Sequence, residues 1–249
     1  MSESKGVAII TGASAGIGRA SAIALGKDGW TVVVTARDEA KLKETASQIE
    51  KSHVIAGDLT SSGFVEKLFK ETAEKFGRVD LVFNNAGMSI GSPSFEDVKL
   101  EDFERTIAVN LVAPFNIIKH AFLQMKSQSP QGGRIINNGS ISAVTPRPGS
   151  AAYTSSKHAI TGLTKTAALD GRKYNIAVSQ IDIGNAATDM GAKVSSGSPQ
   201  ADGSTKNEPT FDVKHVASSI VYMASLPLGA NVLSHTIMAT NMPSWVGRG

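Results

Sequence analysis

Short apolar runs alternate with longer segments of mixed polarity along the whole chain. Runs rich in β-branched residues predict buried strands, and they lie at residues 7–10, 30–35, 53–56, 81–83, 134–137, 177–181 and 233–238. In the segments between them, apolar residues recur with a spacing near 3.6, which predicts helices at residues 17–27, 38–50, 63–76, 100–126, 152–173 and 213–224. Apolar strands separated by helices are typical of a parallel sheet covered on both faces. The pattern therefore predicts an α/β protein built on a doubly wound parallel sheet.

The predicted elements follow one another without a linker. The 249 residues contain no internal repeat, so residues 1–249 are predicted to form a single domain. One stretch differs in composition, because residues 193–210 are polar, rich in Ser and Gly, and hold two prolines. Long loops inside compact domains are often lids. We interpret this stretch as a flexible substrate loop and residues 240–249 as a C-terminal tail.

Composition and charge exclude several classes of protein. The 25 Lys and Arg and the 22 Asp and Glu give a net charge of +3, and basic residues alternate with acidic ones, so no nucleic-acid partner is expected. The absence of cysteine excludes disulfides, a thiolate nucleophile and zinc sites with sulfur ligands. The five histidines lack metal-ligand spacing, so no metal is expected. The N-terminus does not resemble a secretory signal, and no apolar run approaches the roughly 18 residues that cross a membrane. We therefore expect a cytoplasmic protein without a membrane partner.

A glycine-rich turn separates the first predicted strand from the first predicted helix. Residues 11–18 read TGASAGIG, which gives the spacing GxxxGxG. Glycine lets the backbone turn tightly and approach a pyrophosphate, and the N–H groups that begin a helix attract an anion. The turn predicts a dinucleotide site, with tight packing of strand on helix as the alternative. A Gly-Lys-Ser/Thr sequence is not present here, so a triphosphate-binding loop is not supported.

The end of the second predicted strand bears on which dinucleotide binds. In dinucleotide-binding folds an acid at this position binds the ribose hydroxyls, whereas a nearby base accommodates a 2′-phosphate. Here Ala36 ends the strand, Arg37 follows it, and Asp38 is expected to cap the next helix. We therefore expect a preference for NADP(H), with NAD(H) possible. A solvated Arg37 is the alternative interpretation.

Four polar residues in the second half of the pattern are candidates for catalysis. Tyr153 and Lys157 are four residues apart, which puts both side chains on one face of a helix. Ser140 lies thirteen residues before Tyr153, and Asn110 lies within a long predicted helix. Ser142 is an alternative to Ser140. Each residue also has a purely structural explanation: an interface tyrosine, a solvated lysine, a turn serine or a buried asparagine.

Taken together, TGASAGIG, NNAG at residues 84–87, Asn110, Ser140 and YTSSK at residues 153–157 resemble the short-chain dehydrogenase/reductase family. The resemblance covers nearly the whole chain and implies a single Rossmann-like domain with a nicotinamide cofactor. It implies that Tyr153 is the general acid/base and that Ser140 orients the substrate oxygen. Lys157 would bind the nicotinamide ribose, and Asn110 would hold a water in a proton route. The resemblance implies cofactor contacts at Gly12, Ser14, Gly16, Ile17, Gly18, Arg37, Asp58, Leu59, Asn85, Ala86, Gly87, Tyr153, Lys157, Ile183, Gly184 and Thr188.

The proposed acid/base group needs electrostatic help. A free tyrosine is a poor base at neutral pH because its pKa lies near 10. We expect the Lys157 ammonium and the positive charge of the oxidised nicotinamide to lower the pKa of Tyr153. Among the cofactor residues, Asp58 has an alternative explanation as a turn or helix cap.

One segment departs from the pattern of the family. Pro-Gly usually follows the sixth strand, whereas this chain has Ile183-Gly184, with the expected threonine present as Thr188. Proline fixes φ and removes a hydrogen-bond donor. We therefore expect the loop after Ile183 to be less rigid, which affects cofactor placement rather than the acid/base group.

The intact Ser, Tyr and Lys set favours an NADP(H)-dependent oxidoreductase of the carbonyl reductase or alcohol dehydrogenase type. A non-catalytic NADP(H)-binding regulatory or scaffold protein is the alternative, and an isomerising or eliminating enzyme is a third possibility. The expected pocket walls are small, apolar or neutral apart from Arg147, which favours a neutral carbonyl or alcohol substrate; they are residues 89–91, 142–148, 186–187 and the loop after Met190. The resemblance also implies a homotetramer or homodimer with helices 100–126 and 152–173 at one interface. The tail, which carries Trp245, is expected to contact a neighbouring subunit or the substrate mouth.

Overall fold

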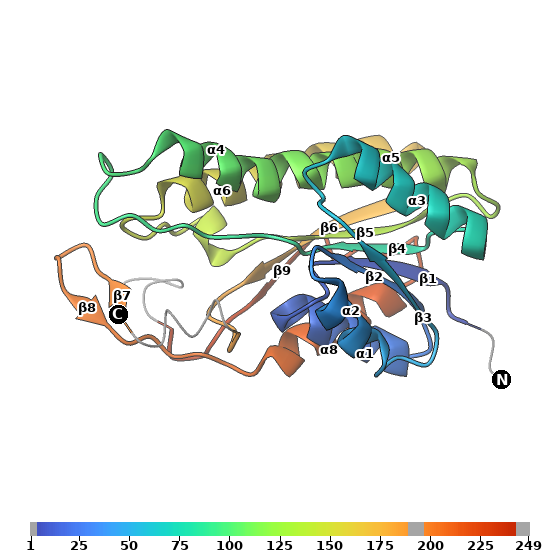
Figure 1. Ribbon diagram of the computed structural model, residues 1–249, viewed down its shortest axis with the longest axis horizontal. Coiled ribbons are helices and arrows are strands. Elements are labelled where there is room, and N and C mark those ends of the chain that lie inside the picture. Colours follow the sequence, from blue (N-terminus) through green and yellow to red (C-terminus); the bar gives the residue numbers. More distant parts are fainter. Residues whose placement is uncertain (1–3, 189–196, 243–249) are drawn as a thin grey trace.

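A parallel sheet forms the middle layer of the computed structural model, which describes residues 4–188 and 197–242 (Figure 1). Its seven strands have the order β3-β2-β1-β4-β5-β6-β9. They are β1 (Val7–Thr11), β2 (Thr31–Ala36), β3 (Ser52–Ala56), β4 (Leu81–Asn84), β5 (Gly133–Asn138), β6 (Ile176–Ile183) and β9 (Ser234–Ile237). The strand order reverses between β1 and β4. Open α/β sheets bind ligands at this reversal, beyond the carboxyl ends of the strands.

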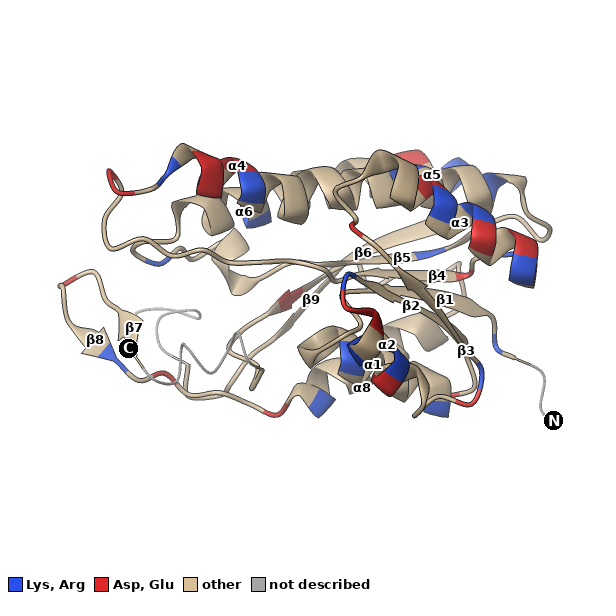
Figure 2. Ribbon diagram, viewed as in Figure 1, with Lys and Arg blue, Asp and Glu red and all other residues tan. Residues whose placement is uncertain are grey.

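Helices cover both faces of the sheet (Figure 1). One layer holds α3 (Ser62–Phe76), α4 (Leu100–Ile107), α5 (Ala113–Ser127) and α6 (Ala151–Gly171), and the other holds α1 (Gly16–Lys27), α2 (Glu39–Ala46) and α8 (Val213–Ser225). Successive strand residues serve opposite layers, since Ile9 packs with α3 and α5 whereas Ala8 and Ile10 pack with α1 and α8. In the view of Figure 2, acidic and basic residues alternate along α3. The predicted doubly wound sheet is confirmed.

The second helix is shorter than predicted. Asp38 caps it as expected, because its Oδ1 accepts a hydrogen bond of 3.1 Å from the Lys41 N–H. The helix ends at Ala46 rather than at residue 50. Ile49 leaves the helix to enter the core, where its Cγ2 lies 2.6 Å from the position that a Cβ on Gly26 would take. Core packing therefore overrides the helical pattern here.

The long predicted helix 100–126 is interrupted by a π-helical turn at Ala108–Val112, which joins α4 to α5. Pro114 explains the interruption, because proline has no N–H and cannot bond the carbonyl four residues earlier, that of Asn110. A proline at this position is a signal that the sequence analysis missed.

By length and mean hydropathy alone, the stretch Leu100–Ser127 could cross a membrane, contrary to the sequence expectation. Its inward side chains include Ile117, Ala121 and Met125, which are fully or almost fully buried against the sheet. The stretch is therefore a core helix of this fold, and its apolar character reflects that packing.

The predicted loop 193–210 contains a short antiparallel hairpin of β7 (Ser198–Pro199) and β8 (Thr205–Lys206). Asp202-Gly203 forms its turn, with Gly203 at φ 81° and the Ser204 N–H donating to Asp202 Oδ1 over 2.9 Å. Asp-Gly is typical of hairpin turns, and this hairpin is a feature of the loop that was not predicted from the sequence. Residues 193–196 of this loop, and tail residues 243–249 with Trp245, lie outside the described residues.

Candidate active site

The glycine turn after β1 packs against the chain that leaves β4. Gly12 has φ 66°, and a Cβ there would lie 3.0 Å from both Ala86 Cα and Asn85 Nδ2. A Cβ on Gly18 would lie 2.3 Å from the Gly12 carbonyl oxygen. Glycine is therefore required at both positions. The turn brings two of the segments predicted to bind the cofactor into direct contact.

Thr11, the last residue of β1, connects these segments. Its Oγ1 accepts hydrogen bonds from the backbone N–H groups of Asn85 and Ala86, at 2.8 and 2.9 Å. Asn85 Oδ1 accepts a bond of 2.9 Å from Asn138 Nδ2 at the end of β5. Thr11 and Asn138 were not among the residues predicted from the sequence. Polar side chains at the last position of a buried strand are the signal that could have found them.

The start of α1, unlike those of α2, α3 and α8, has no side chain among the described residues that caps its backbone N–H groups. In α2, α3 and α8, the side chain of the residue before the helix accepts a hydrogen bond from one of the first backbone N–H groups. The three capping residues are Asp38, Ser61 and Asp212. Ala15 precedes α1 and cannot cap it, and no acid occupies its first turn in the described structure. The N–H groups of α1 can therefore meet an anion such as a pyrophosphate. Thr188 lies beside this turn, its Cγ2 3.3 Å from the position of a Cβ on Gly16.

The end of β2 carries the exposed side chain of Arg37. Asp58, which follows β3, forms the turn that the sequence analysis weighed as an alternative, because its Oδ1 accepts from the Thr60 N–H over 2.9 Å. This hydrogen bond chiefly lowers the pKa of Asp58, and the charge of Arg37 lowers it further. Leu59 is buried in the core. The charge of Arg37 therefore acts on Asp58 beyond the carboxyl ends of β2 and β3.

Ser140, Tyr153 and Lys157 come together beyond the ends of β5 and β6. Lys157 is 4% exposed; its Nζ donates to the Asn138 carbonyl over 2.7 Å and lies 5.5 Å from the centre of the Tyr153 ring. Ser140 precedes the 3₁₀ turn Ile141–Ala143, and its Oγ accepts from the Ser142 N–H over 3.1 Å. Ser142 thus contributes its backbone, and the Ser140 side chain is the one that lowers the pKa of Tyr153.

Burial governs the ionisation of this group of residues. It raises the pKa of the half-buried Tyr153, while the Ser140 hydrogen bond and the Arg147 charge lower it and Asp182 raises it. Burial lowers the pKa of Lys157 to about 8, opposed by the negative charge of Asp182. The expectation that Lys157 lowers the pKa of Tyr153 is therefore not met by the chain alone. Tyr153 is protonated at neutral pH.

Asn110 is 2% exposed and lies in the π-helical turn. Its Nδ2 donates to the Met88 carbonyl over 2.8 Å and to Ser156 Oγ over 3.1 Å, and its Oδ1 accepts from the Met88 N–H over 2.9 Å. The side chain thus joins the segment after β4 to α6. Gly87 lies against it, since a Cβ there would be 3.4 Å from Asn110 Oδ1 and 4.0 Å from Lys157 Nζ.

Hydrogen bonds hold the segment at the end of β6, where this chain has Ile183-Gly184 in place of the Pro-Gly of the family pattern. Ile183 is the last residue of β6 and is buried, and the Gly184 N–H donates to the Ile237 carbonyl over 2.8 Å. Beyond it, the Ala187 N–H donates to the Phe211 carbonyl over 2.8 Å. These bonds supply constraint that the sequence analysis expected to be lost with the proline.

Arg147 joins the loop before α6 to the hairpin segment. It forms an ion pair with the buried Glu208, and its Nη1 donates to Ser198 Oγ over 2.7 Å. Its Nη2 also donates to Asn185 Oδ1 over 3.0 Å. The positive charge that the sequence analysis singled out in the pocket wall is therefore matched by a carboxylate.

A cavity of about 200 Å³ lies beside the start of α6. Ile90 and Gly91, which were predicted to form part of the pocket wall, line it together with Phe103 and Ala152. Ala152 immediately precedes Tyr153. Among residues 4–188 and 197–242, no cluster of three or more His, Asp or Glu could hold a metal ion.

Comparisons with known proteins agree with this geometry. The profile of a family described as short chain dehydrogenase matches residues 6–199. Sulfoacetaldehyde reductase 2 of Chromohalobacter salexigens is 30% identical over 239 residues, which cover 94% of each chain. The structure of a 3-ketoacyl-(acyl-carrier-protein) reductase from Brucella melitensis complexed with NADH superposes with a TM-score of 0.84 at 22% identity, over 96% of this chain and 99% of the other. That of an alcohol dehydrogenase from the archaeon Thermococcus sibiricus, complexed with 5-hydroxy-NADP, has a TM-score of 0.82 at 25% identity, over 96% and 98% of the two chains.

Proposed function

This chain belongs to the short-chain dehydrogenase family of oxidoreductases, and we propose that it transfers a hydride between NADP(H) and a carbonyl or secondary alcohol. The observation that carries the proposal is the meeting of Ser140, Tyr153 and Lys157 at the sheet edge where the glycine turn also lies. We further propose that one domain, located in the cytoplasm, holds both the cofactor and the substrate.

The residues present fit a dinucleotide. Gly12 and Gly18 leave a turn that no Cβ fills, and the uncapped N–H groups of α1 face the space in which a pyrophosphate would bind. Arg37, with Ala36 in place of an acid, supports NADP(H) over NAD(H). The bound nicotinamide would supply or accept the hydride. Lys157 has three N–H donors and uses one on the Asn138 carbonyl, which leaves donors for the nicotinamide ribose.

In the reductive direction the protonated Tyr153 donates its proton to the substrate oxygen. The Ser140 hydroxyl donates a hydrogen bond to the same oxygen and orients it. The Lys157 ammonium stabilises the phenolate that remains. General acid catalysis of this kind contributes roughly 10²- to 10⁴-fold. Tyr153 is protonated at neutral pH, as a proton donor in the reductive direction must be.

Asn110 contributes to this site through its backbone in our proposal. Its side-chain amide is already bonded to Met88 and Ser156. Pro114 cannot bond the Asn110 carbonyl, so that carbonyl can accept a hydrogen bond from a water. We propose that this water returns a proton to Tyr153 by way of Lys157.

We propose a neutral substrate, because Glu208 matches the charge of Arg147 beside the site. We also propose a homodimer or homotetramer. Four apolar side chains of α5, α6 and the π-helical turn are more than half exposed: Val112, Phe115, Leu123 and Leu169. Burying such residues favours association. Light scattering that showed only monomer at micromolar concentration would contradict the assembly.

A screen of NADPH consumption with ketones, aldehydes and quinones, repeated with NADH, tests the proposed function. We expect turnover with a neutral carbonyl and a preference for NADPH. Tight NADPH binding without turnover of any substrate would favour the non-catalytic scaffold, and failure to bind either cofactor would refute both. Equal use of NADH would refute the assigned role of Arg37.

A further inference from the structure

A buried carboxylate lies directly beneath Ser140. Asp182, near the end of β6, is 6% exposed. Its Oδ1 accepts hydrogen bonds from the Ser140 N–H over 2.9 Å and from Gln180 Nε2 over 2.8 Å. A Cβ on Gly139 would lie 2.1 Å from that oxygen, so only glycine lets the carboxylate reach the backbone here. Asp182 therefore fixes the main chain from which the Ser140 hydroxyl extends.

Asp182 also faces the charged groups of the site. Alternation along β6 directs Gln180 and Asp182 to the α6 side of the sheet, where Gln180 Nε2 also bonds Thr161 Oγ1 of α6 over 3.0 Å. The negative charge of Asp182 raises the pKa of both Tyr153 and Lys157, which lie on α6.

The remaining charges near this face are accounted for. Arg147 acts on Tyr153 from the loop before α6, and its charge is paired with Glu208. His235 of the neighbouring strand β9 pairs in register with Ile181, whose side chain packs toward α1 and α8. The His235 ring lies 3.1 Å from Ser219 Oγ of α8, on the opposite side of the sheet from Asp182.

We propose that Asp182 is a positioning residue of this reaction, which anchors Ser140 through its backbone N–H and keeps a buried carboxylate beneath the Ser140, Tyr153 and Lys157 group. The inference rests on the proposed function, because it assigns Asp182 to the reductive direction of that chemistry. Loss of the negative charge would release the protons of Tyr153 and Lys157 at lower pH. The pH above which Tyr153 can no longer donate a proton to a carbonyl substrate would then be lower.

Asp182→Asn tests the proposal, because the amide oxygen can still accept the Ser140 N–H while the charge is gone. Phenolate absorbance followed against pH in the cofactor-free protein reports Tyr153, after subtraction of the same curve for Tyr153→Phe. We expect the midpoint to fall by roughly one pH unit in Asp182→Asn. The pH at which kcat for reduction declines should fall in the same direction. An unchanged midpoint in the folded variant overturns the proposal.

Asp80→Asn is the matched control. Asp80 also accepts a backbone N–H, that of Val7 over 2.9 Å, but it lies at the amino ends of the strands. We expect no change in either pH curve, and a shift equal to that of Asp182→Asn would make the effect non-specific. Asp182→Ser provides a second uncharged side chain. If thermal melting shows that neither Asp182 variant folds, Asp182 serves stability and the proposal is overturned.

These measurements distinguish a failure of the role assigned to Asp182 from a failure of the proposed function. A wild-type protein that reduces no substrate would refute the proposed function, while the absorbance curves would still report the charge effect. A reductase whose curves do not respond to Asp182→Asn would refute the inference alone.

Discussion

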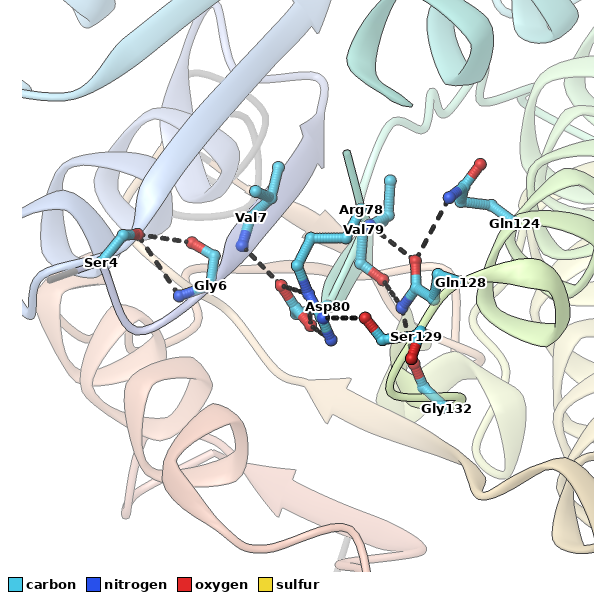
Figure 3. A network of polar contacts seen from close by, with 10 residues as sticks. All are labelled: Ser4, Gly6, Val7, Arg78, Val79, Asp80, Gln124, Gln128, Ser129 and Gly132. Carbon is cyan, nitrogen blue, oxygen red and sulfur yellow. Dashed lines mark hydrogen bonds and ion pairs between the residues drawn. The ribbon is translucent and has the colours of Figure 1, made fainter. Parts of the chain in front are cut away.

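The two edges of the central sheet carry polar networks of different character. At the amino edge, shown in Figure 3, Arg78 Nη2 lies 2.6 Å from Asp80 Oδ1, and Asp80 Oδ2 accepts the Val7 N–H. Gln128, at the end of α5, accepts the Val79 N–H and donates to the Val79 carbonyl, both over 2.9 Å. Every charged group in this network has a close partner of opposite charge or a hydrogen bond.

At the carboxyl edge, burial has shifted the ionisation of the charged groups. Lys157 has a pKa of about 8, and burial raises the pKa of Asp182. Two buried carbonyl oxygens near this edge, Asn84 Oδ1 and Gln180 Oε1, find no hydrogen-bond partner among the described residues. An unpaired buried polar group destabilises a fold. Unpartnered buried polar atoms also occur at the amino edge of the described structure, at Asp28 Oδ2 and Trp30 Nε1. The two edges therefore differ in the ionisation of Lys157 and Asp182 rather than in the presence of unpartnered groups.

Removing the acid/base group should give the largest effect. In Tyr153→Phe only the hydroxyl is lost, so we expect turnover to fall toward the upper end of the roughly 10²- to 10⁴-fold range. The melting temperature and NADPH affinity should change little. Steady-state kinetics and fluorescence titration of NADPH measure the two quantities. Retention of more than about a tenth of the wild-type rate would show that Tyr153 is not the proton donor.

Arg78→Ala perturbs the opposite edge. It removes charge-assisted hydrogen bonds to Asp80 and a bond of 3.0 Å from Nη1 to the Ser129 carbonyl. Because these groups are partly exposed, we expect a loss of unfolding free energy of about 1–3 kcal/mol with kcat unchanged. Urea unfolding and kinetics on the same sample make the comparison. A large fall in kcat in the still-folded variant would contradict the division between the edges.

Replacing Ala36 by Asp together with Arg37 by Ser should change the cofactor and leave the rest of the carboxyl edge intact. One charge-assisted hydrogen bond is worth roughly 1.5–3 kcal/mol, or about ten- to a hundredfold. We expect kcat/KM with NADH to rise relative to kcat/KM with NADPH by this factor. An unchanged ratio would mean that the 2′-phosphate is not bound by Arg37.

Lys157→Met should give a small change in stability whose sign is informative. The pKa of Lys157 is about 8 in the fold against 10.5 when exposed, so the folded state loses this proton first. Wild-type stability should therefore rise between about pH 8 and pH 10.5. Methionine removes the buried charge but also the bond to the Asn138 carbonyl, and we expect a net gain of about 1 kcal/mol at neutral pH. Activity and cofactor affinity should fall.

Thermal melting of the wild type and Lys157→Met from pH 7 to pH 10 checks this sign. The difference between the two proteins should shrink as the pH rises. A wild type that is more stable than Lys157→Met at every pH would show that Lys157 stabilises the fold, as Arg78 does.

Much of this architecture could be predicted from the sequence because its signals are local. The β-branched run of β2 predicts a strand wherever it lies, and the glycines of residues 11–18 are needed by a turn that closes within a few residues. The closeness of Tyr153 and Lys157 is also a local property, since one turn of helix separates them. The sequence alone therefore determined the doubly wound sheet, the family resemblance and the candidate catalytic residues.

Only the tertiary structure decided which distant polar groups meet. Asp182 bonds the backbone of Ser140 across 42 residues, and Arg147 pairs with Glu208 across 61. Neither contact has a periodic signature, because each depends on the parallel register of neighbouring strands and on the course of the loops beyond them. Burial, which sets the pKa of Tyr153 and Lys157, is a property of that assembled edge. It arises from all the elements packed around these residues rather than from any one segment of the chain.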